Sequence, residues 1–139
     1  MESGVTVGVV DERNEIAAMN KGIEQIDLGI RTDVISNISK EIGIKMLIRS
    51  MSPKVIAVDE IGGKKDAEIM NYASKSGVKI LATIHGNSIE DIKNNRGIRE
   101  ILDNKLLEKI IVLDKKEKNK ISEAYYLNKD KNTYEREII

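Results

Sequence analysis

Two adjacent carboxylates, Asp59 and Glu60, follow directly after an apolar run at residues 55–58. Because a strand that is covered on both faces has a continuous apolar run, this stretch predicts a buried strand of a parallel sheet. Ligands of open α/β sheets bind beyond the carboxyl ends of the strands, where these acids lie. As in a Walker B motif, Asp59 could hold Mg²⁺ of a nucleoside triphosphate while Glu60 polarises the attacking water. A solvated strand end is the alternative explanation.

Two further predicted strands, over residues 5–10 and 78–84, also end in polar side chains. These side chains are Asp11, Glu12, Thr83 and His85. Because the carboxyl ends of parallel strands meet at one edge of a sheet, we expect these groups to gather near the acidic pair. Simpler explanations stay open: a polar strand end for the two acids, and a hydrogen-bonded turn residue for His85.

The elements that must position these residues alternate between strands and helices. Helical patterns cover residues 38–51, 64–76, 88–91 and 96–104, and a further buried strand covers residues 110–113. The alternation predicts an α/β fold with a mostly parallel sheet and helices on both faces. Residues 14–33 indicate a surface loop with at most one helical turn. Residues 121–127 and 133–138 predict a C-terminal β-hairpin.

Composition excludes several classes of protein. The chain has 139 residues, enough for one domain, with 23 basic and 23 acidic side chains, so the net charge gives no argument for a nucleic-acid partner. With no Cys and one His, neither a disulfide nor a Cys/His zinc site can form, which predicts a cytoplasmic protein. No apolar run approaches the roughly 18 residues of a membrane-spanning helix.

A phosphate-binding loop of the form Gly-x-x-x-x-Gly-Lys-Ser/Thr is absent from the sequence. The segment at residues 62–65, Gly-Gly-Lys-Lys, has the wrong spacing and follows the wrong strand. Without a cradle of backbone N–H groups, affinity for a triphosphate should be poor. Either the chain is not a nucleotide enzyme, or it starts downstream of the phosphate loop; as given, we expect it not to hydrolyse ATP.

Five ordered segments carry a resemblance to a known family. They are VVDERNEIA at residues 9–17, DLGIRTDV at 27–34, MLIRSMSP at 46–53, VDEIG at 58–62 and ATIHG at 82–86. The chain resembles the stage III sporulation protein AA family over roughly residues 5–113. That family resembles secretion-type AAA+/RecA-like ATPases and is expected to act at the channel complex between mother cell and forespore in endospore-forming bacteria.

The resemblance implies a role for each candidate residue. It makes Asp59 the Mg²⁺-associated Walker B acid and Glu60 the catalytic carboxylate. Asp11 and Glu12 are similar to the acidic box that faces the nucleotide across the cleft. His85 is similar to a sensor of the γ-phosphate. Thr83, two residues earlier, is expected to belong to the residues that bind the nucleotide.

Two arginines complete the set that the resemblance implies. Arg31 and Arg49 could neutralise phosphate charge within or between subunits, as an arginine finger does, although an exposed Arg usually has no such role. The sequence departs from the family at Gly63, where relatives tend to carry a basic residue. Lys64 or Lys65 could substitute for it.

For the fold, the resemblance implies a partial RecA-like (ASCE) domain at residues 1–114, with the C-terminal hairpin at 115–139 appended to it. The central phosphate-loop strand, which would lie between the strands at 78–84 and 110–113, is missing. These two strands must therefore pair directly or accept another chain, because unpaired buried backbone groups cost about 1–3 kcal/mol each. We expect the second outcome, and hence self-association.

Two classes of function follow. The first is an ATPase that uses ATP and Mg²⁺ in the full-length protein, with weak or absent binding by this chain, and that forms a homo-oligomer. Its partners would be other stage III sporulation channel proteins, which would place it in the cytoplasm or peripherally at the forespore-engulfing membrane. The second is a nucleotide-independent interaction module with the same fold. A phosphate loop encoded upstream would decide between them.

Overall fold

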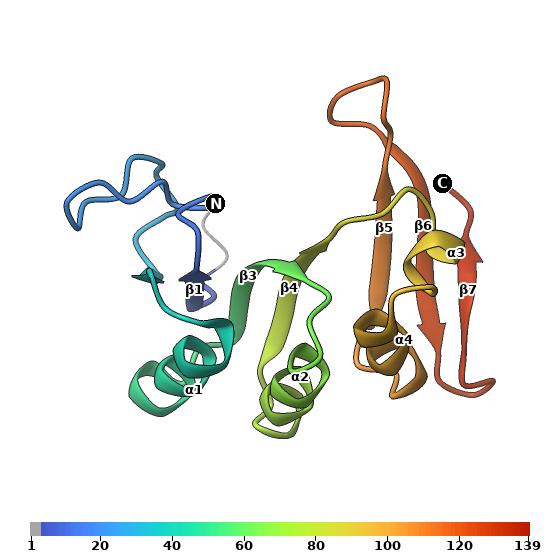
Figure 1. Ribbon diagram of the computed structural model, residues 1–139, viewed down its shortest axis with the longest axis horizontal. Coiled ribbons are helices and arrows are strands. Elements are labelled where there is room, and N and C mark those ends of the chain that lie inside the picture. The colour runs from blue at the N-terminus through green and yellow to red at the C-terminus, as the bar shows by residue number, and fades with distance from the viewer. Residues whose placement is uncertain (1–3) are drawn as a thin grey trace.

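Figure 1 shows the computed structural model, which describes residues 4–139. The elements over this range are β1 (Val7–Asp11), β2 (Thr32–Ser36), α1 (Lys40–Met51), β3 (Val55–Ile61), α2 (Asp66–Lys75), β4 (Lys79–Ile84), α3 (Ile89–Ile92), α4 (Arg96–Asp103), β5 (Lys109–Leu113), β6 (Ile121–Asn128) and β7 (Thr133–Glu137). The alternation of strands and helices confirms the predicted α/β class. None of the helices in this range is long and apolar enough to cross a membrane.

The first four strands form a parallel sheet in the order β2-β1-β3-β4. Strand β1 lies inside this sheet, with Val7 opposite Thr32 of β2 on one side and Val55 of β3 on the other. Both β1 and β3 are mostly buried, as their continuous apolar runs predict. The carboxyl ends of all four strands therefore lie at one edge of the sheet.

Strand β2 was not predicted. The loop expected over residues 14–33 gives way to a strand at Thr32, and β2 pairs with β1 at the edge of the sheet. Edge strands need not be apolar on both faces, and β2 has only Val34 and Ile35 as large apolar residues. Its sequence therefore lacks the continuous apolar run that reveals β1 and β3.

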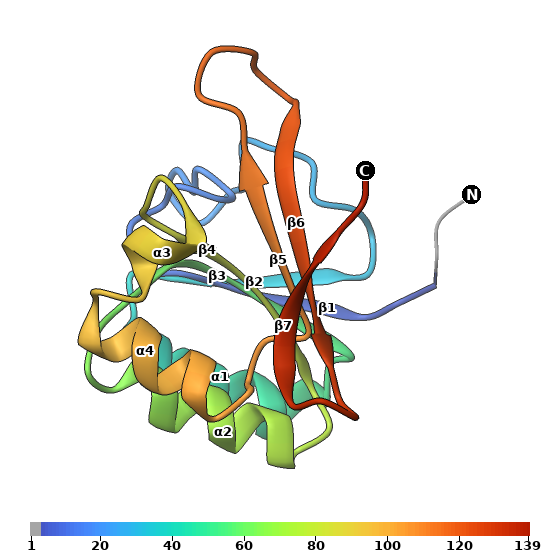
Figure 2. The same cartoon turned by 90° about the vertical axis from the view of Figure 1, so that its right-hand side faces the viewer.

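The helices α1, α2 and α4 lie on one face of the parallel sheet, which corrects the expectation of helices on both faces (Figures 1 and 2). The reason is the strand order. From β2 to β3 and from β3 to β4 the chain moves across the sheet in the same direction. Crossovers of the same hand that move in the same direction place their helices on the same face.

The hydrophobic core lies between this sheet face and the helices. The fully buried large apolar side chains are Val10, Ile44, Ile56, Ile98 and Ile101. Helix α1 comes close to β1 at Gly43, where an added Cβ atom would lie 2.5 Å from Cγ1 of Val10. On α2 and α4 the side chains that face this core are Ala67, Met70, Ala73, Ile98, Ile101 and Leu102, all of which are buried.

The predicted C-terminal hairpin is confirmed as the antiparallel pair β6 and β7. Strand β5 joins it on the other side, in the order β5-β6-β7, and does not extend the parallel sheet. Within residues 4–139, β4 and β5 do not pair with each other. Direct closure between these two strands, one of the two outcomes considered for the missing strand, is therefore not what the chain adopts.

Candidate functional site

A polar cavity of about 600 Å³ lies beyond the carboxyl ends of β1 and β3. Among its lining side chains are Glu12, Arg13, Lys40, Glu60, Lys65 and His85. Three of the predicted residues, Glu12, Glu60 and His85, are thus brought together from three different strand ends. The structure meets the expectation that parallel alignment would gather polar groups at this edge.

Asp59 directly precedes Glu60 in β3 but is not among the side chains that line the cavity, and it lies below the surface. The residue is 5% exposed, and neither carboxylate oxygen has a hydrogen-bond partner among the described residues. An ionised carboxylate that is buried without a partner destabilises a fold strongly, so such groups are rare outside functional sites. The pairing of β3 with β4 is also irregular between Val58 and Ile61, and such irregularities commonly re-aim side chains next to active sites.

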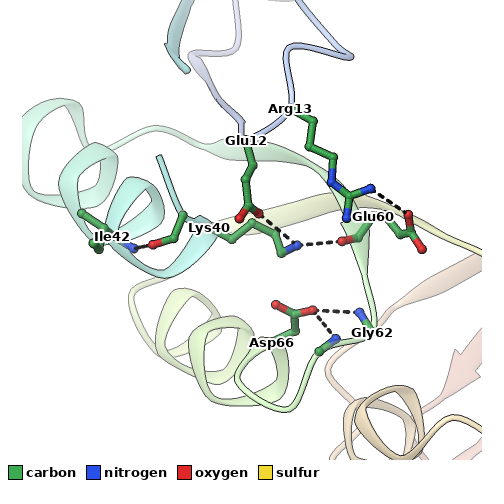
Figure 3. A network of polar contacts seen from close by, with 9 residues as sticks. Glu12, Arg13, Lys40, Ile42, Glu60, Gly62 and Asp66 are labelled. Carbon is green, nitrogen blue, oxygen red and sulfur yellow. Dashed lines mark hydrogen bonds and ion pairs between the residues drawn. The ribbon is translucent and has the colours of Figure 1, made fainter. Parts of the chain in front are cut away.

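Glu60 follows with a side chain that is 47% exposed, and it is held by cations from two other elements (Figure 3). Nη1 of Arg13 lies 3.6 Å from Oε2 of Glu60. Nζ of Lys40 donates a hydrogen bond of 2.8 Å to the backbone oxygen of Glu60 and lies 3.4 Å from Oε2 of Glu12. Lys40, the first residue of α1, therefore ties the ends of β1 and β3 together.

Asp11 has a structural role in the turn after β1. It is fully buried, and its carboxylate accepts hydrogen bonds from the backbone N–H groups of Glu15, Ile16 and Ala17, the shortest at 2.8 Å. Because its oxygens are engaged in this way, Asp11 fixes the turn that carries Glu12 and Arg13 to the cavity. Of the predicted acidic box, Glu12 is the member that lines the cavity.

The turn at Gly62 and Gly63 binds a carboxylate of the chain itself. Oδ2 of Asp66 accepts hydrogen bonds from the N–H groups of both glycines, at 2.8 and 2.7 Å. Gly62 has φ +156°, and an added Cβ at Gly97 of α4 would lie 2.6 Å from the Gly62 carbonyl oxygen. The two N–H groups that resemble a phosphate cradle are thus already used, in keeping with the wrong spacing of this segment.

The remaining predicted residues lie away from the cavity. Arg31 immediately precedes β2, at the amino end of the sheet, and its Nη1 is 3.5 Å from the backbone oxygen of Gly4. Arg49 is exposed in the last turn of α1, about 13 Å along the helix axis from Lys40. Thr83 lines a second cavity, between β4 and β5. A role for either arginine in this site would require a second subunit.

Sequence reasoning missed the cations of the site. Arg13 stands inside the segment at residues 9–17, where its spacing does not relate it to Glu60, and Lys40 lies outside all five segments that carry the resemblance. The cap residue Ser39, whose side chain accepts from Ile42 N–H, marks the start of α1 and hence the position of Lys40. That Lys40 reaches two strand ends depends on the packing of α1, which spacing does not show.

Comparison with known proteins adds to this geometry. A family model described as "Sporulation stage III, protein AA" matches residues 2–132. The chain is also similar to the stage III sporulation protein AA of Bacillus subtilis (strain 168), with 36% identity over 133 residues. The match covers 95% of this chain and 43% of the relative, so the chain spans less than half the length of that protein.

Proposed function

Because this chain belongs to the stage III sporulation protein AA family, and so has a role in sporulation, we propose that its polar cavity is the acidic half of a site that hydrolyses a Mg²⁺-bound nucleoside triphosphate. The observation that carries this proposal is the unpartnered carboxylate of Asp59. It stands directly before Glu60, whose side chain lines the cavity. A buried anion without a partner and an accessible anion beside it suit a metal ligand and a general base, respectively.

The donor set fits Mg²⁺ held mainly by its substrate. No group of three or more His, Cys, Asp or Glu side chains that could hold a metal occurs within residues 4–139. Mg²⁺ at phosphoryl-transfer sites is commonly held by one or two carboxylates, with phosphate oxygens and waters completing the octahedron. Asp59 would be the protein ligand, and bound Mg²⁺ would neutralise charge on the phosphate oxygens.

The residues of this chain have separate tasks in the proposed reaction. Glu60 orients a water molecule and accepts its proton as the water attacks the terminal phosphorus, whose bond to the oxygen of the departing nucleoside diphosphate breaks. For this, Glu60 exchanges its contact with Arg13 for one with the water, which frees the guanidinium to face phosphate oxygens. Lys40 keeps the backbone of Glu60 and the side chain of Glu12 in place, and the exposed His85 lies at the same cavity.

The phosphate cradle has to come from outside the described residues. The one glycine turn at the cavity, at Gly62 and Gly63, already binds Asp66, and the sequence contains no phosphate loop. Chain 1–139 alone should therefore not hydrolyse ATP. More than half of the Bacillus subtilis relative lies outside the match, which leaves room for a cradle in proteins of this family.

A second candidate is a nucleotide-independent interaction module, and it is supported by the absence of a phosphate loop from this sequence. In that case Arg13 and Lys40 would serve only to neutralise Glu60 and Glu12. For either candidate we propose a homo-oligomer that docks on other stage III sporulation channel proteins at the membrane. The ATPase would couple hydrolysis to that complex, whereas the module would only assemble it.

Metal binding tests the acidic half of the site in chain 1–139. Mg²⁺ at millimolar concentration should raise the Tm of the unmodified chain and leave that of Asp59→Asn unchanged, because a ligand stabilises only a state that binds it. Asp33→Asn removes an exposed carboxylate from β2 and should keep the full shift. If all three proteins respond equally, Asp59 is not the metal ligand.

The catalytic role of Glu60 is tested by measuring ATP hydrolysis. The protein for this test is a polypeptide that joins this chain to the phosphate loop of a family member. Glu60→Gln should leave nucleotide binding nearly intact and slow turnover by orders of magnitude, since orienting water is a transition-state role. Asp59→Ala should weaken binding of Mg²⁺-nucleotide as well. Equal loss of binding in both variants would support the interaction module.

A further inference from the structure

A cavity of about 620 Å³, lined by residues of α3, α4, β6 and β7, shares no residue with the polar cavity at the strand ends. Buried Ile89 and Leu102 form part of its lining, together with the half-buried side chains of Tyr125 and Tyr134. We call this cavity the tyrosine groove. Tyrosine is enriched at protein interfaces because its ring offers apolar area and its hydroxyl a polar end. The groove therefore has the composition of a protein-binding surface.

Three cations at the tyrosine groove make no ion pair within residues 4–139. They are the exposed Lys93 and Arg99 and the half-buried Lys105. Nε of Arg99 donates a hydrogen bond of 2.9 Å to the backbone oxygen of Lys93, which fixes the guanidinium beside the end of α3. Nζ of Lys105 lies 5.3 Å from the centre of the Tyr134 ring. The groove thus offers positive charge in fixed positions for an acidic partner.

At the other end of the molecule, the loop after β1 exposes an acidic and apolar segment at residues 22–30 (Figure 1). Its exposed large apolar side chains are Ile23 at 66%, Ile26 at 47% and Ile30 at 87%. The segment also carries two exposed carboxylates, Glu24 and Asp27, and contains no Lys or Arg. Large apolar side chains that are exposed close together are typical of an interaction site.

Hydrogen bonds within the loop hold this segment in shape. The backbone groups of Asn20 and Ile23 bond to each other in both directions, at 2.9 and 3.0 Å. The N–H group of Gln25 donates to the backbone oxygen of Ala17, and that of Gly29 donates to Oδ1 of Asp27. A segment that is already shaped loses less conformational entropy when it binds.

The segment and the tyrosine groove complement each other in charge and polarity. The acids of the segment match the unpaired cations of the groove, and its isoleucines match the tyrosine rings. The groove has two acids of its own, Glu90 and Asp103, which could pair with Lys21 and Arg31 at the ends of the segment. The two surfaces lie at opposite ends of the longest axis of the molecule, so they can meet only between two copies (Figure 1).

We propose that residues 22–30 of one copy dock in the tyrosine groove of the next copy. The isoleucines pack on the groove's apolar lining, and Glu24 and Asp27 pair with its cations. Because the two surfaces differ, the contact repeats head to tail and gives a ring where the rotation closes. This interface rests on the homo-oligomer of the proposed function and uses no residue of the polar cavity.

Sedimentation velocity of chain 1–139 tests the interface. At concentrations between about 10 μM and 1 mM the unmodified chain should form species larger than a monomer, and added salt should weaken them. The loop variant is Glu24→Lys with Asp27→Asn, in which Asn keeps the acceptor for the N–H group of Gly29. The groove variant is Lys93→Glu with Arg99→Glu. Each should weaken association by about tenfold or more, because like charges then face each other.

An equimolar mixture of the two variants is the decisive sample. The changed loop then meets the changed groove, and each unchanged surface also finds its complement, so association should return to roughly the level of the unmodified chain. The control, Ile42→Lys with Met46→Lys, changes exposed apolar residues of α1 and should associate as the unmodified chain does.

Three results would overturn the proposal: an unmodified chain that stays monomeric, variants that associate as strongly as the unmodified chain, or a mixture that associates no better than its components. Both variants should keep the rise in Tm that Mg²⁺ causes in the unmodified chain, since they leave the polar cavity intact. Absence of that rise in the unmodified chain would contradict the metal site and not this interface.

Discussion

Nζ of Lys40 lies 2.8 Å from the backbone carbonyl oxygen of Glu60 and donates a hydrogen bond to it. The side chain of Lys40 is only 16% exposed, whereas the acceptor belongs to the exposed residue Glu60. This acceptor is a main-chain atom, and Lys40 therefore restrains the end of β3 itself. The orientation of the Glu60 side chain depends on that restraint.

Replacing Lys40 should accordingly destabilise the fold. We expect Lys40→Met to lower the free energy of unfolding by about 1 kcal/mol, the net value of a typical hydrogen bond, because the side chain of Lys40 is largely buried while its acceptor residue is exposed. The matched control is Lys45→Met on the same helix, because Lys45 pairs with Glu41 at the surface, which is worth about 0.5 kcal/mol or less. Urea denaturation measures both, and equal losses would show that Lys40 is not a special contact.

Asp59→Asn should make the metal-free chain more stable. The substitution removes a buried charge that has no partner in the described structure, and we expect a gain of about 1–3 kcal/mol. Glu60→Gln changes an accessible carboxylate and should stay within about 0.5 kcal/mol of the unmodified chain. A loss of stability in Asp59→Asn would mean that the carboxylate is paired in solution.

Gly97→Ala should be more damaging than Gly8→Ala. A Cβ atom at Gly97 meets backbone oxygens of Gly62 and Gly63, at 2.6 and 2.8 Å, and these cannot move without opening the Asp66 turn. At Gly8 the nearest atom belongs to the end of the Leu47 side chain, which can rotate. We expect a cost of about 2–3 kcal/mol at Gly97 and about 1 kcal/mol or less at Gly8, measured by urea denaturation.

The β6–β7 hairpin should respond to acid through Glu135. Hydrogen bonds from Lys131, Asn128 and Tyr126 lower the pKa of this carboxyl to about 2. Because the folded pKa lies below the unfolded value of about 4.3, the stabilisation is present above that value and is lost as the pH falls toward 2. NMR titration of the Glu135 carboxyl should show the low pKa in the unmodified chain.

Variants on the same turn identify the cause of that shift. Lys131→Met removes the largest contribution and should move the pKa of Glu135 toward its ordinary value. Lys129→Met removes a neighbouring charge that does not contact Glu135 and should leave the titration unchanged. If Lys131→Met has no effect, the ion pair between Lys131 and Glu135 does not form in solution.

The parts of the fold that the sequence predicts are those with one dominant physical cause. Continuous apolar runs reveal β1 and β3, and helical periodicity reveals α1 and α2. In both cases burial requires apolar residues at positions that follow from the geometry of the element. The edge strand β2 is buried too little to show such a pattern. Whether helices lie on one face or both depends on the order of strands in the sheet, which no single segment encodes.

The candidate site shows the same division. Glu12, Glu60 and His85 could be placed together from sequence because parallel strands end at one edge. Lys40 could not, since its contact with Glu60 depends on where α1 packs. Asp11 accepts hydrogen bonds from N–H groups of its own turn, which only the three-dimensional path of residues 12–17 reveals, and its role at a nucleotide stays a prediction.

The strands of the two sheets can pair at different times after they are synthesised. Strands β5, β6 and β7 follow one another in the chain and pair through short turns, and such hairpins form within about 1–10 μs. Strand β1 pairs on one side with β3, which follows only after the long loop, β2 and α1. At about 5–20 residues per second, a ribosome needs seconds to deliver that partner. During synthesis, the apolar residues of β1 therefore wait seconds for this partner, whereas the pairing within the second sheet needs only neighbouring segments.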